Sequence, residues 1–359
     1  MNRSIADAQS VDSKMIEAQP ARPVLLVGSV PLGSVAEVFE VVAANLGDLI
    51  RRVPDGEVGP RLEWIAWQKQ TMGRATGIEI GGFREIQGGA VKYTQYKIKA
   101  GLRPEDVDFG SLGYAEAAKT SYAKFREVRD AGKIPRGVRF QVSLPTPLAV
   151  VFAFFIPSDI RKVWPVYEQR LFDEVDEIVA TIPQEDLAIQ WDVAVEIDGI
   201  LEVPAVAKSW SKDELIDAII RACNRVPAAV ELGIHLCYGD PGHKHLVEPT
   251  DMGLMVELAN RFTAKVKRPI TWVHMPVPRD RDDEAYFAPL QDLRLHSGTE
   301  LYIGLIHLRD GISGAIKRLA AAKQVIPKFG IATECGFGRR NPETIFSLIK
   351  LHREVASLQ

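Results

Sequence analysis

The feature that most constrains the fold is a regular alternation of short apolar, β-branched runs with longer amphipathic stretches. It extends from Pro23 to the end of the 359-residue chain. Runs that are apolar at nearly every position, each followed by a helical pattern, are typical of parallel strands covered by helices on their outer face. Eight such units, spread over more than about 250 residues, predict a single (β/α)8 TIM barrel of the α/β class.

The eight strands are expected within residues 22–30, 85–98, 137–145, 185–196, 228–240, 268–277, 299–311 and 329–340. A doubly wound open sheet would instead carry a G-x-G-x-x-G turn after its first strand, and VGSVPLGS (27–34) lacks that spacing. We therefore expect a flexible N-terminal tail over residues 1–22 and a catalytic barrel over residues 23–359. An insertion is expected after the first βα unit, between Arg51 and Ser121.

Composition excludes several classes of binding partner. A net charge of -3 and a pI near 6.2 argue against nucleic-acid binding, because no basic excess is available to neutralise phosphates. No apolar run reaches the roughly 20 residues that span a bilayer. Three cysteines are too few for a disulfide framework and fit a reducing compartment. We expect a cytoplasmic protein that acts on a small molecule. The sequence is compatible with either a monomer or an oligomer.

Polar residues that could do chemistry follow the predicted strands, at the end where TIM-barrel enzymes carry their active sites. They are Ser29, Ser143, Asp192, His235, Cys237, His274, His307, Glu334 and Cys335. His235 and Cys237 are two residues apart in a strand, so their side chains share one face. Zinc takes thiolate and imidazole ligands in tetrahedral sets.

We therefore predict a zinc site made of His235, Cys237, His274 and Cys335. Cys223 is assigned to a helix core, and the histidine pair in GHKH (242–245) stays a weaker alternative.

IHLCY and ECGFGRR resemble two motifs of the cobalamin-independent methionine synthase C-terminal barrel, a strand-five His-x-Cys and a strand-eight Asp-Cys-Gly followed by basic residues. LAIQWDVAVE, LLVGSVPL and QVSLPTPLAV are similar to its strand-four, opening Gly-Ser-x-Pro and strand-three segments. The resemblance covers most of the chain from Pro23 onward and is shared more loosely with the uroporphyrinogen-decarboxylase-like superfamily.

The resemblance implies a zinc-bound thiolate that accepts a methyl or alkyl group, with a folate or another methyl carrier as co-substrate. By position, His235, Cys237 and Cys335 match the family's ligands, and Asp192 matches a carboxylate that holds the substrate amine. Ser29 and Tyr238 lie in the matching motifs and are expected to contact substrate. His307 stands where the family carries an acidic residue.

Three departures argue against methionine synthesis itself. His274 stands where the family has a glutamate ligand, which would make the zinc site neutral and its thiolate less reactive. WDVAVE replaces Asp-Glu-Pro, so the clamp for an amino acid is incomplete. The duplicated N-terminal barrel of the long methionine synthases is absent from this sequence.

The segment RRVPDGEVGPR (51–61) has two readings. Pro-Asp-Gly is a turn signal, or the loop brings Asp55, Glu57 and Arg61 over the barrel mouth to contact substrate. In the second reading Trp64, Trp67 and Trp191 would form an aromatic wall for a planar substrate.

Three functions follow from these observations. The leading one is a zinc-dependent methyl or alkyl transferase. The second is a metal-dependent lyase, decarboxylase or hydrolase, with Asp192, Glu196 or His307 as acid or base. The third is a metal- or corrinoid-handling protein that binds without turnover.

Overall fold

The computed structural model describes residues 21–86, 91–201, 210–239 and 245–358. Most of the predicted tail, and residues 242–244 of the GHKH segment, lie outside these ranges. The last residue assigned to the tail, Arg22, is described and is held in place. Its backbone N–H donates to the carbonyl of Ala356, and its guanidinium lies 4.5 Å from the ring centre of Phe329.

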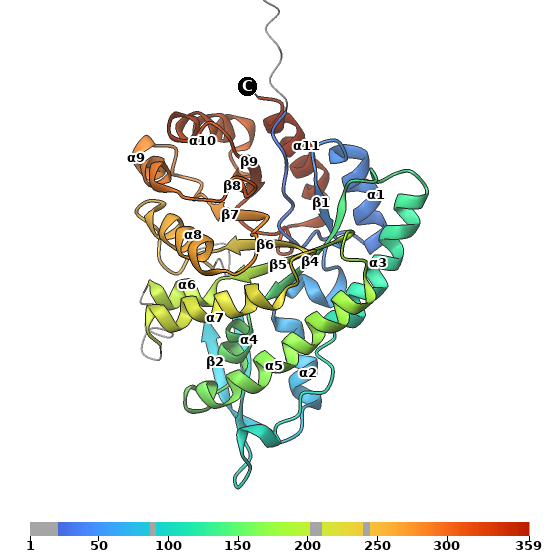
Figure 1. Cartoon of the computed structure of the whole chain (residues 1–359), viewed down its shortest axis with the longest axis vertical. Coiled ribbons are helices and arrows are strands. Elements are labelled where there is room, and N and C mark those ends of the chain that lie inside the picture. The colour runs from blue at the N-terminus through green and yellow to red at the C-terminus, as the bar shows by residue number, and fades with distance from the viewer. Residues whose placement is uncertain (1–20, 87–90, 202–209, 240–244, 359) are drawn as a thin grey trace, which may run out of the picture.

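The main sheet has seven parallel strands in the order β1-β4-β5-β6-β7-β8-β9. They are β1 (Arg52–Pro54), β4 (Arg139–Pro145), β5 (Leu187–Val193), β6 (Glu231–Leu236), β7 (Trp272–Pro276), β8 (Glu300–Ile306) and β9 (Gly330–Thr333). Figure 1 shows β4 to β9 succeeding one another, with α7, α8, α10 and α11 outside them. This order is that of a barrel, in agreement with the predicted fold class.

The first predicted strand lies between the two edges of this sheet. Val24 forms parallel bridges with both Ile50 and Ile331, and Ser29 forms one with Gly56. The segment is extended but makes too few ladder bonds to count as a strand of its own. It nevertheless connects β9 to β1 and so closes the ring.

Eleven α-helices are described: α1 (Val35–Leu46), α2 (Lys69–Arg74), α3 (Tyr114–Asp130), α4 (Pro147–Phe154), α5 (Pro157–Thr181), α6 (Val195–Ile200), α7 (Lys212–Arg225), α8 (Gly253–Lys265), α9 (Glu284–Phe287), α10 (Gly311–Val325) and α11 (Ile345–Ala356). Local sequence explains several of their starts. Ser211 and Glu214 form a capping box at the start of α7. Proline at the first position of α4 follows the N-cap Thr146. Among the described residues, no helix is long and apolar enough to cross a membrane.

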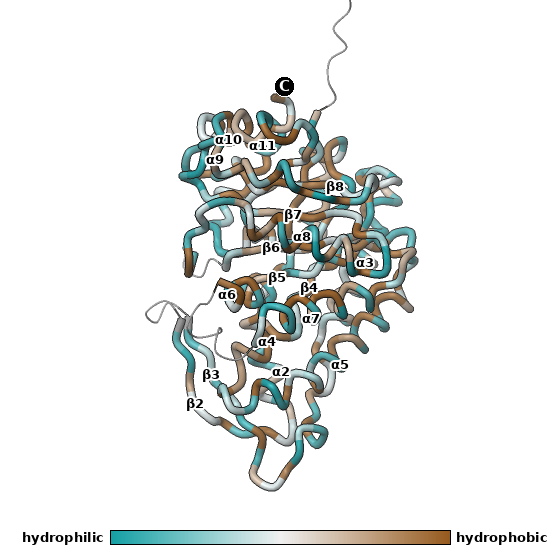
Figure 2. The backbone as a smooth tube through the Cα atoms, turned by 60° about the vertical axis from the view of Figure 1, so that its left-hand side comes forward, coloured by the Kyte–Doolittle hydropathy of each residue, from teal (hydrophilic) through white to brown (hydrophobic). Residues whose placement is uncertain are grey.

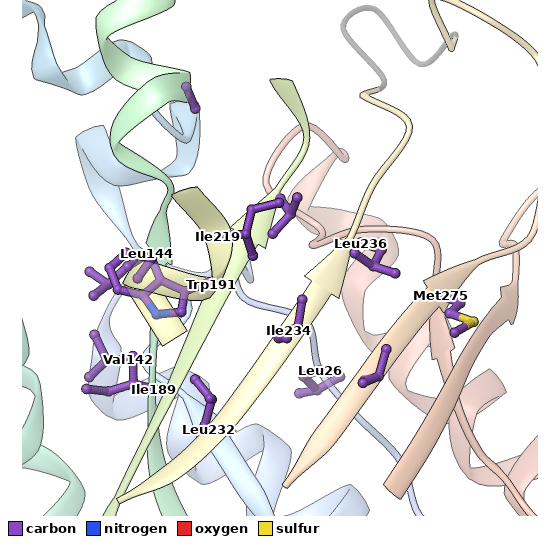
Figure 3. Close-up of a cluster of buried hydrophobic side chains, with 14 of the residues drawn as sticks. Leu26, Val142, Leu144, Ile189, Trp191, Ile219, Leu232, Ile234, Leu236 and Met275 are labelled. Atoms are coloured by element: carbon purple, nitrogen blue, oxygen red, sulfur yellow. The ribbon is translucent and has the colours of Figure 1, made fainter. Parts of the chain in front are cut away.

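Alternation along the strands divides the core into two parts. On the outer face, side chains such as Ile189, Ile234 and Leu236 pack toward the helices, as Figure 3 shows for β5 and β6. A smaller cluster inside the barrel contains Leu25, Val27, Ala188, Trp272, Tyr302 and Ala332. Above this apolar layer, the next inward positions of β5, β6 and β7 are polar, and they form the site described below.

The prediction for the second strand was wrong. Residues 91–98, placed in the barrel by the sequence pattern, form β3 (Val91–Ile98), which pairs antiparallel with β2 (Ile78–Ile86) in a separate hairpin. Figure 2 shows this hairpin at one side of the molecule, apart from the main sheet. The true second barrel strand is the three-residue β1, whose Arg52 and Pro54 do not follow a strand pattern. The hairpin belongs to the predicted insertion.

Arg52 closes the lower, N-terminal end of the barrel. Its guanidinium is 1% exposed, pairs with Glu231 at 3.1 Å and Glu300 at 3.0 Å, and lies 4.2 Å from the ring centre of Trp272. The sheet therefore encloses a cation whose charge is neutralised from two other strands.

We expect Arg52→Ala to lower the free energy of unfolding by about 2–4 kcal/mol, because it removes a buried cation and leaves a gap beside Trp272. Glu231 and Glu300 then keep only the more exposed Arg139 and Arg51 as partners. Arg51→Ala is the matched control: Arg51 also pairs with Glu300, but its side chain is 58% exposed. Its loss should cost at most about 1 kcal/mol. Urea unfolding at neutral pH measures both, and equal effects would contradict this account of Arg52.

Candidate functional site

Three of the four predicted zinc ligands come together at the C-terminal end of the barrel. One ligand atom from each of His235, Cys237 and Cys335 can be chosen so that all lie within 4.8 Å of one another. His235 is on β6, Cys237 follows that strand by one residue, and Cys335 follows β9. The group thus joins parts of the chain that lie about a hundred residues apart, which the barrel brings together at one end.

The fourth predicted ligand, His274, lies behind this group and is not part of it. Its Nδ1 is 2.7 Å from Nδ1 of His235, and its Nε2 is 3.0 Å from the carbonyl oxygen of Thr333. β6 and β7 pair His235 directly with His274, which accounts for the contact. Burial lowers the pKa of His235 well below its usual range and that of His274 to about 3, so both rings are neutral at pH 7.

The three residues fit zinc. Two sulfurs and one neutral imidazole are donors that this metal prefers. Nε2 of His235 is buried, and no hydrogen-bond partner lies near it in the described part of the chain. A buried ring nitrogen left without a partner is costly unless something else binds its lone pair. Since the group has three protein donors, a bound ion would keep a further position for another ligand.

Two desolvated carboxyl groups, Asp192 and the half-buried Glu57, adjoin the group of His235, Cys237 and Cys335 (the metal group) through Asp192. Asp192 on β5 pairs with His235 in the sheet register, so both side chains point into the barrel. Glu57 accepts a hydrogen bond from the Ser29 hydroxyl at 2.5 Å. Burial raises the pKa of Glu57 to about 7 and that of Asp192 well above its usual range, where the charge of Glu57 adds to the shift. At neutral pH these two groups do not both ionise readily without a cation.

Asp55, which lies close to Glu57 in the fold, hydrogen-bonds to both Arg61 and Ser121. Asp55 accepts from both guanidinium nitrogens of Arg61, at 2.6 and 3.3 Å, and from the Ser121 hydroxyl at 2.6 Å. A small cavity of about 10 Å³ is lined by Asp55, Glu57 and Arg61 together with Ser143. Of this segment, Glu57 reaches Ser29, whereas Asp55 turns to Ser121 of α3. That Asp55, Glu57 and Arg61 contact a substrate stays a prediction.

Two residues of this segment have strained backbones. Glu57 (φ 49°) and Trp64 (φ 53°) are the non-glycine residues with positive φ in the described ranges. The conformation costs about 1–3 kcal/mol for each and persists only where surrounding contacts enforce it. Glu57 reaches Ser29, and the Trp64 side chain hydrogen-bonds Asp192. Both strained residues thus direct side chains into the same polar cluster.

The predicted aromatic wall is not formed. Trp191 is fully buried on the outer face of β5, 6.5 Å from the ring of Phe172 in α5, because it alternates with the inward-facing Gln190 and Asp192. Figure 3 shows it among the apolar side chains. Trp67 packs edge-on against Tyr114. Of the three tryptophans, Trp64 is the one that lies at the polar cluster, and Trp191 lies away from that cluster.

The other predicted site residues lie around the rim. Tyr238 is 1% exposed, with its ring 5.5 Å from that of His245. His307 places Nε2 2.8 Å from the carbonyl oxygen of Val277 and Nδ1 3.6 Å from Glu334, and burial lowers its pKa. Glu196, on α6, is buried with its pKa raised to about 7 by desolvation.

His245 and Gln190 are site residues whose roles the sequence reasoning did not identify. His245 contacts Glu334 at 3.3 Å and Glu248 at 2.9 Å. Burial lowers its pKa, but these carboxylates outweigh that effect and raise it to about 9. Gln190 donates to Asp192 at 2.9 Å and to the Val27 carbonyl at 2.6 Å. Its place two residues before Asp192 was the available signal, because both face the barrel interior.

We expect Glu57→Gln to be more stable than the wild type at pH 8, by up to about 3 kcal/mol, and equal to it near pH 5. The folded-state pKa of about 7 lies above the ordinary 4.5. The folded protein therefore holds the extra proton between these values, and stability falls as the pH rises through that window. Urea unfolding from pH 5 to 8 measures this. Glu63→Gln, at an exposed position of the same segment, is the control. A wild type and Glu57→Gln with the same pH slope would contradict the assignment.

No protein-family model matches the sequence, and no match was found among curated proteins. Solved structures do match. A B12-independent methionine synthase from Shewanella sp. W3-18-1, in complex with selenomethionine, aligns with a TM-score of 0.56 and 15% identity over 94% of this chain and 96% of that one. A candidate vitamin B12-independent methionine synthase from Listeria monocytogenes aligns with a TM-score of 0.51 and 11% identity over 92% and 96%. The resemblance expected from the motifs is confirmed at the level of the fold, and this chain has the barrel fold of those methionine synthase structures.

Proposed function

We propose that the protein is a zinc-dependent transferase that moves a methyl or alkyl group to or from the thiol of a small molecule carrying an amino group. The observation that supports this most is the convergence of His235, Cys237 and Cys335 within 4.8 Å near two desolvated carboxyl groups. Zinc bound there would keep a substrate thiol deprotonated at neutral pH and present it as a nucleophile.

The two carboxyl groups are the reason for proposing an amino group on the substrate. Glu57 and Asp192 are desolvated and repel each other's charge. A substrate ammonium would stabilise both ionised carboxylates, because an opposite charge within a few ångströms offsets desolvation. The amino-acid clamp that was incomplete in the sequence of β5 thus gains a second carboxyl group from the segment after β1. A folate or other methyl carrier as co-substrate stays part of the proposal.

The runner-up function is a metal-dependent lyase, decarboxylase or hydrolase. It is favoured by the same open ligand position, which could hold water, and by Asp192, whose raised pKa suits an acid. Glu196 and His307 are the other candidates for acid or base. Since the metal group holds two sulfurs, the donor set favours thiol chemistry over water activation.

Cobalt in place of zinc tests the proposed function directly. We expect one cobalt ion per chain and a stronger sulfur-to-cobalt absorption band when a small aminothiol is added, because a third sulfur then joins the ion. Isosteric alcohols serve as the matched control and should leave the band unchanged. An absorption band that no thiol alters would contradict the transferase and favour the hydrolytic alternative. Tight thiol binding without transfer to any methyl carrier would point to a metal- or corrinoid-handling protein.

A further inference from the structure

A buried chain of hydrogen bonds runs from Thr333 through His274 to His235. The His274 side chain is 0% exposed, and its two ring nitrogens face different partners, the Thr333 carbonyl at 3.0 Å and Nδ1 of His235 at 2.7 Å. A carbonyl oxygen can only accept a hydrogen bond. A single ring hydrogen on His274 therefore lies on Nε2, and its Nδ1 is an acceptor.

This assignment determines the state of His235. Two ring nitrogens at hydrogen-bond distance share one hydrogen, so Nδ1 of His235 must donate to Nδ1 of His274. A neutral imidazole that carries its hydrogen on Nδ1 has its lone pair on Nε2. That atom is the buried ring nitrogen of His235 for which the described residues offer no hydrogen-bond partner. It is free to bind an ion together with the two sulfurs.

The surroundings hold His274 in this orientation. Gly304 on β8 faces the ring, and a Cβ atom at that position would lie 2.9 Å from Nε2 of His274 and 2.7 Å from the Thr333 carbonyl oxygen. Glycine therefore leaves the space that the ring and its acceptor occupy. The Thr333 hydroxyl also donates to the carbonyl of Cys335 at 2.6 Å. Thr333 therefore contacts both His274 and the backbone of the proposed ligand Cys335.

We propose that His274 is a positioning residue and not a metal ligand. It fixes the tautomer and the direction of His235, so that Nε2 is the ring nitrogen left to bind an ion together with Cys237 and Cys335, and it leaves the fourth coordination position to the substrate. To bind the ion through Nδ1, His274 would have to break its contact with His235. The proposal rests on the zinc-dependent function proposed above and specifies which residues of that site touch the metal.

X-ray absorption at the zinc edge of the full, zinc-loaded chain distinguishes the two roles. We expect two sulfurs and one imidazole around the ion in the wild type. Two imidazoles would overturn the positioning role and leave the proposed function intact. A wild type that takes up no zinc would instead contradict the proposed function itself.

Variants at position 274 give a second readout. His274→Ala should weaken zinc affinity ten- to a hundredfold, the usual effect of losing the residue that orients a ligand, with the same shell at saturating zinc. His274→Gln should recover part of the affinity, because an amide can both accept from His235 and donate to Thr333, and it covers the case that the alanine variant does not fold. His352→Gln, at a fully buried histidine of α11 with its Nδ1 2.7 Å from the Leu348 carbonyl, is the matched control and should bind zinc like the wild type. A His274→Ala shell with one imidazole fewer than the wild type, or unchanged affinity in both variants at this position, would overturn the inference.

Discussion

Replacing either Cys237 or Cys335 by serine is expected to abolish stoichiometric zinc binding. A serine hydroxyl stays protonated at neutral pH and is a far weaker ligand than a thiolate, so each variant keeps only two of the three donors. We expect zinc affinity to fall at least about a hundredfold, more than the loss of an orienting residue causes. Metal analysis after dialysis against a competing chelator measures the effect.

Cys223→Ser is the matched control for this result. Cys223 is fully buried on α7 among apolar side chains, and burial raises the pKa of its thiol to about 12. This variant should retain one zinc ion per chain even if its stability falls. Full zinc content in Cys335→Ser would show that the three-residue group does not bind the metal, and the proposed chemistry would fail with it.

The second large effect is expected at the carboxyl pair. Asp192→Asn and Glu57→Gln should each weaken the binding of a small aminothiol such as cysteamine by about a hundredfold or more. Removing one partner of a buried ion pair costs about 3–5 kcal/mol. 2-Mercaptoethanol has the same length but no ammonium group, so its affinity should change little. Calorimetric titration of the zinc-loaded protein with both thiols gives the comparison.

A contrary pattern would be equally informative. If both variants lose affinity for the two thiols alike, the carboxyl groups act on the metal group or on stability and not on an amine. If Glu57→Gln changes neither affinity, Asp192 alone holds the substrate. Asp55→Asn is a less suitable probe of the amine, because Asp55 already has Arg61 and Ser121 as partners.

Alternation along a strand was the sequence signal that placed some of the candidate site residues correctly. An i, i+2 pair in a strand shares one face, which placed His235 and Cys237 together without any tertiary information. The same rule would have placed Trp191 outside, since Asp192 and Gln190 face inward. That prediction failed because proximity in sequence was considered before the alternation of the strand.

The hydrophobic pattern of the sequence did not predict the first barrel strand or its neighbour β1 correctly. Residues 23–30 have the composition of a buried strand yet form only isolated bridges, whereas the three residues of β1 pair in the sheet despite their charged and proline members. Arg52 is buried there only because Glu231 and Glu300 arrive from other strands. Such long-range compensation leaves no local signal.

By itself the sequence determined the barrel class and the end of the barrel that carries the polar residues, because both depend on local periodicity. It also predicted four zinc ligands, of which His235, Cys237 and Cys335 lie together. The tertiary structure decided that His274 turns its two nitrogens to His235 and Thr333, and that Glu57 lies close enough to Asp192 for their charges to interact. Those relations depend on which strands are neighbours and on how closely their side chains pack. Distances of that kind arise only when the sheet closes and brings remote segments together.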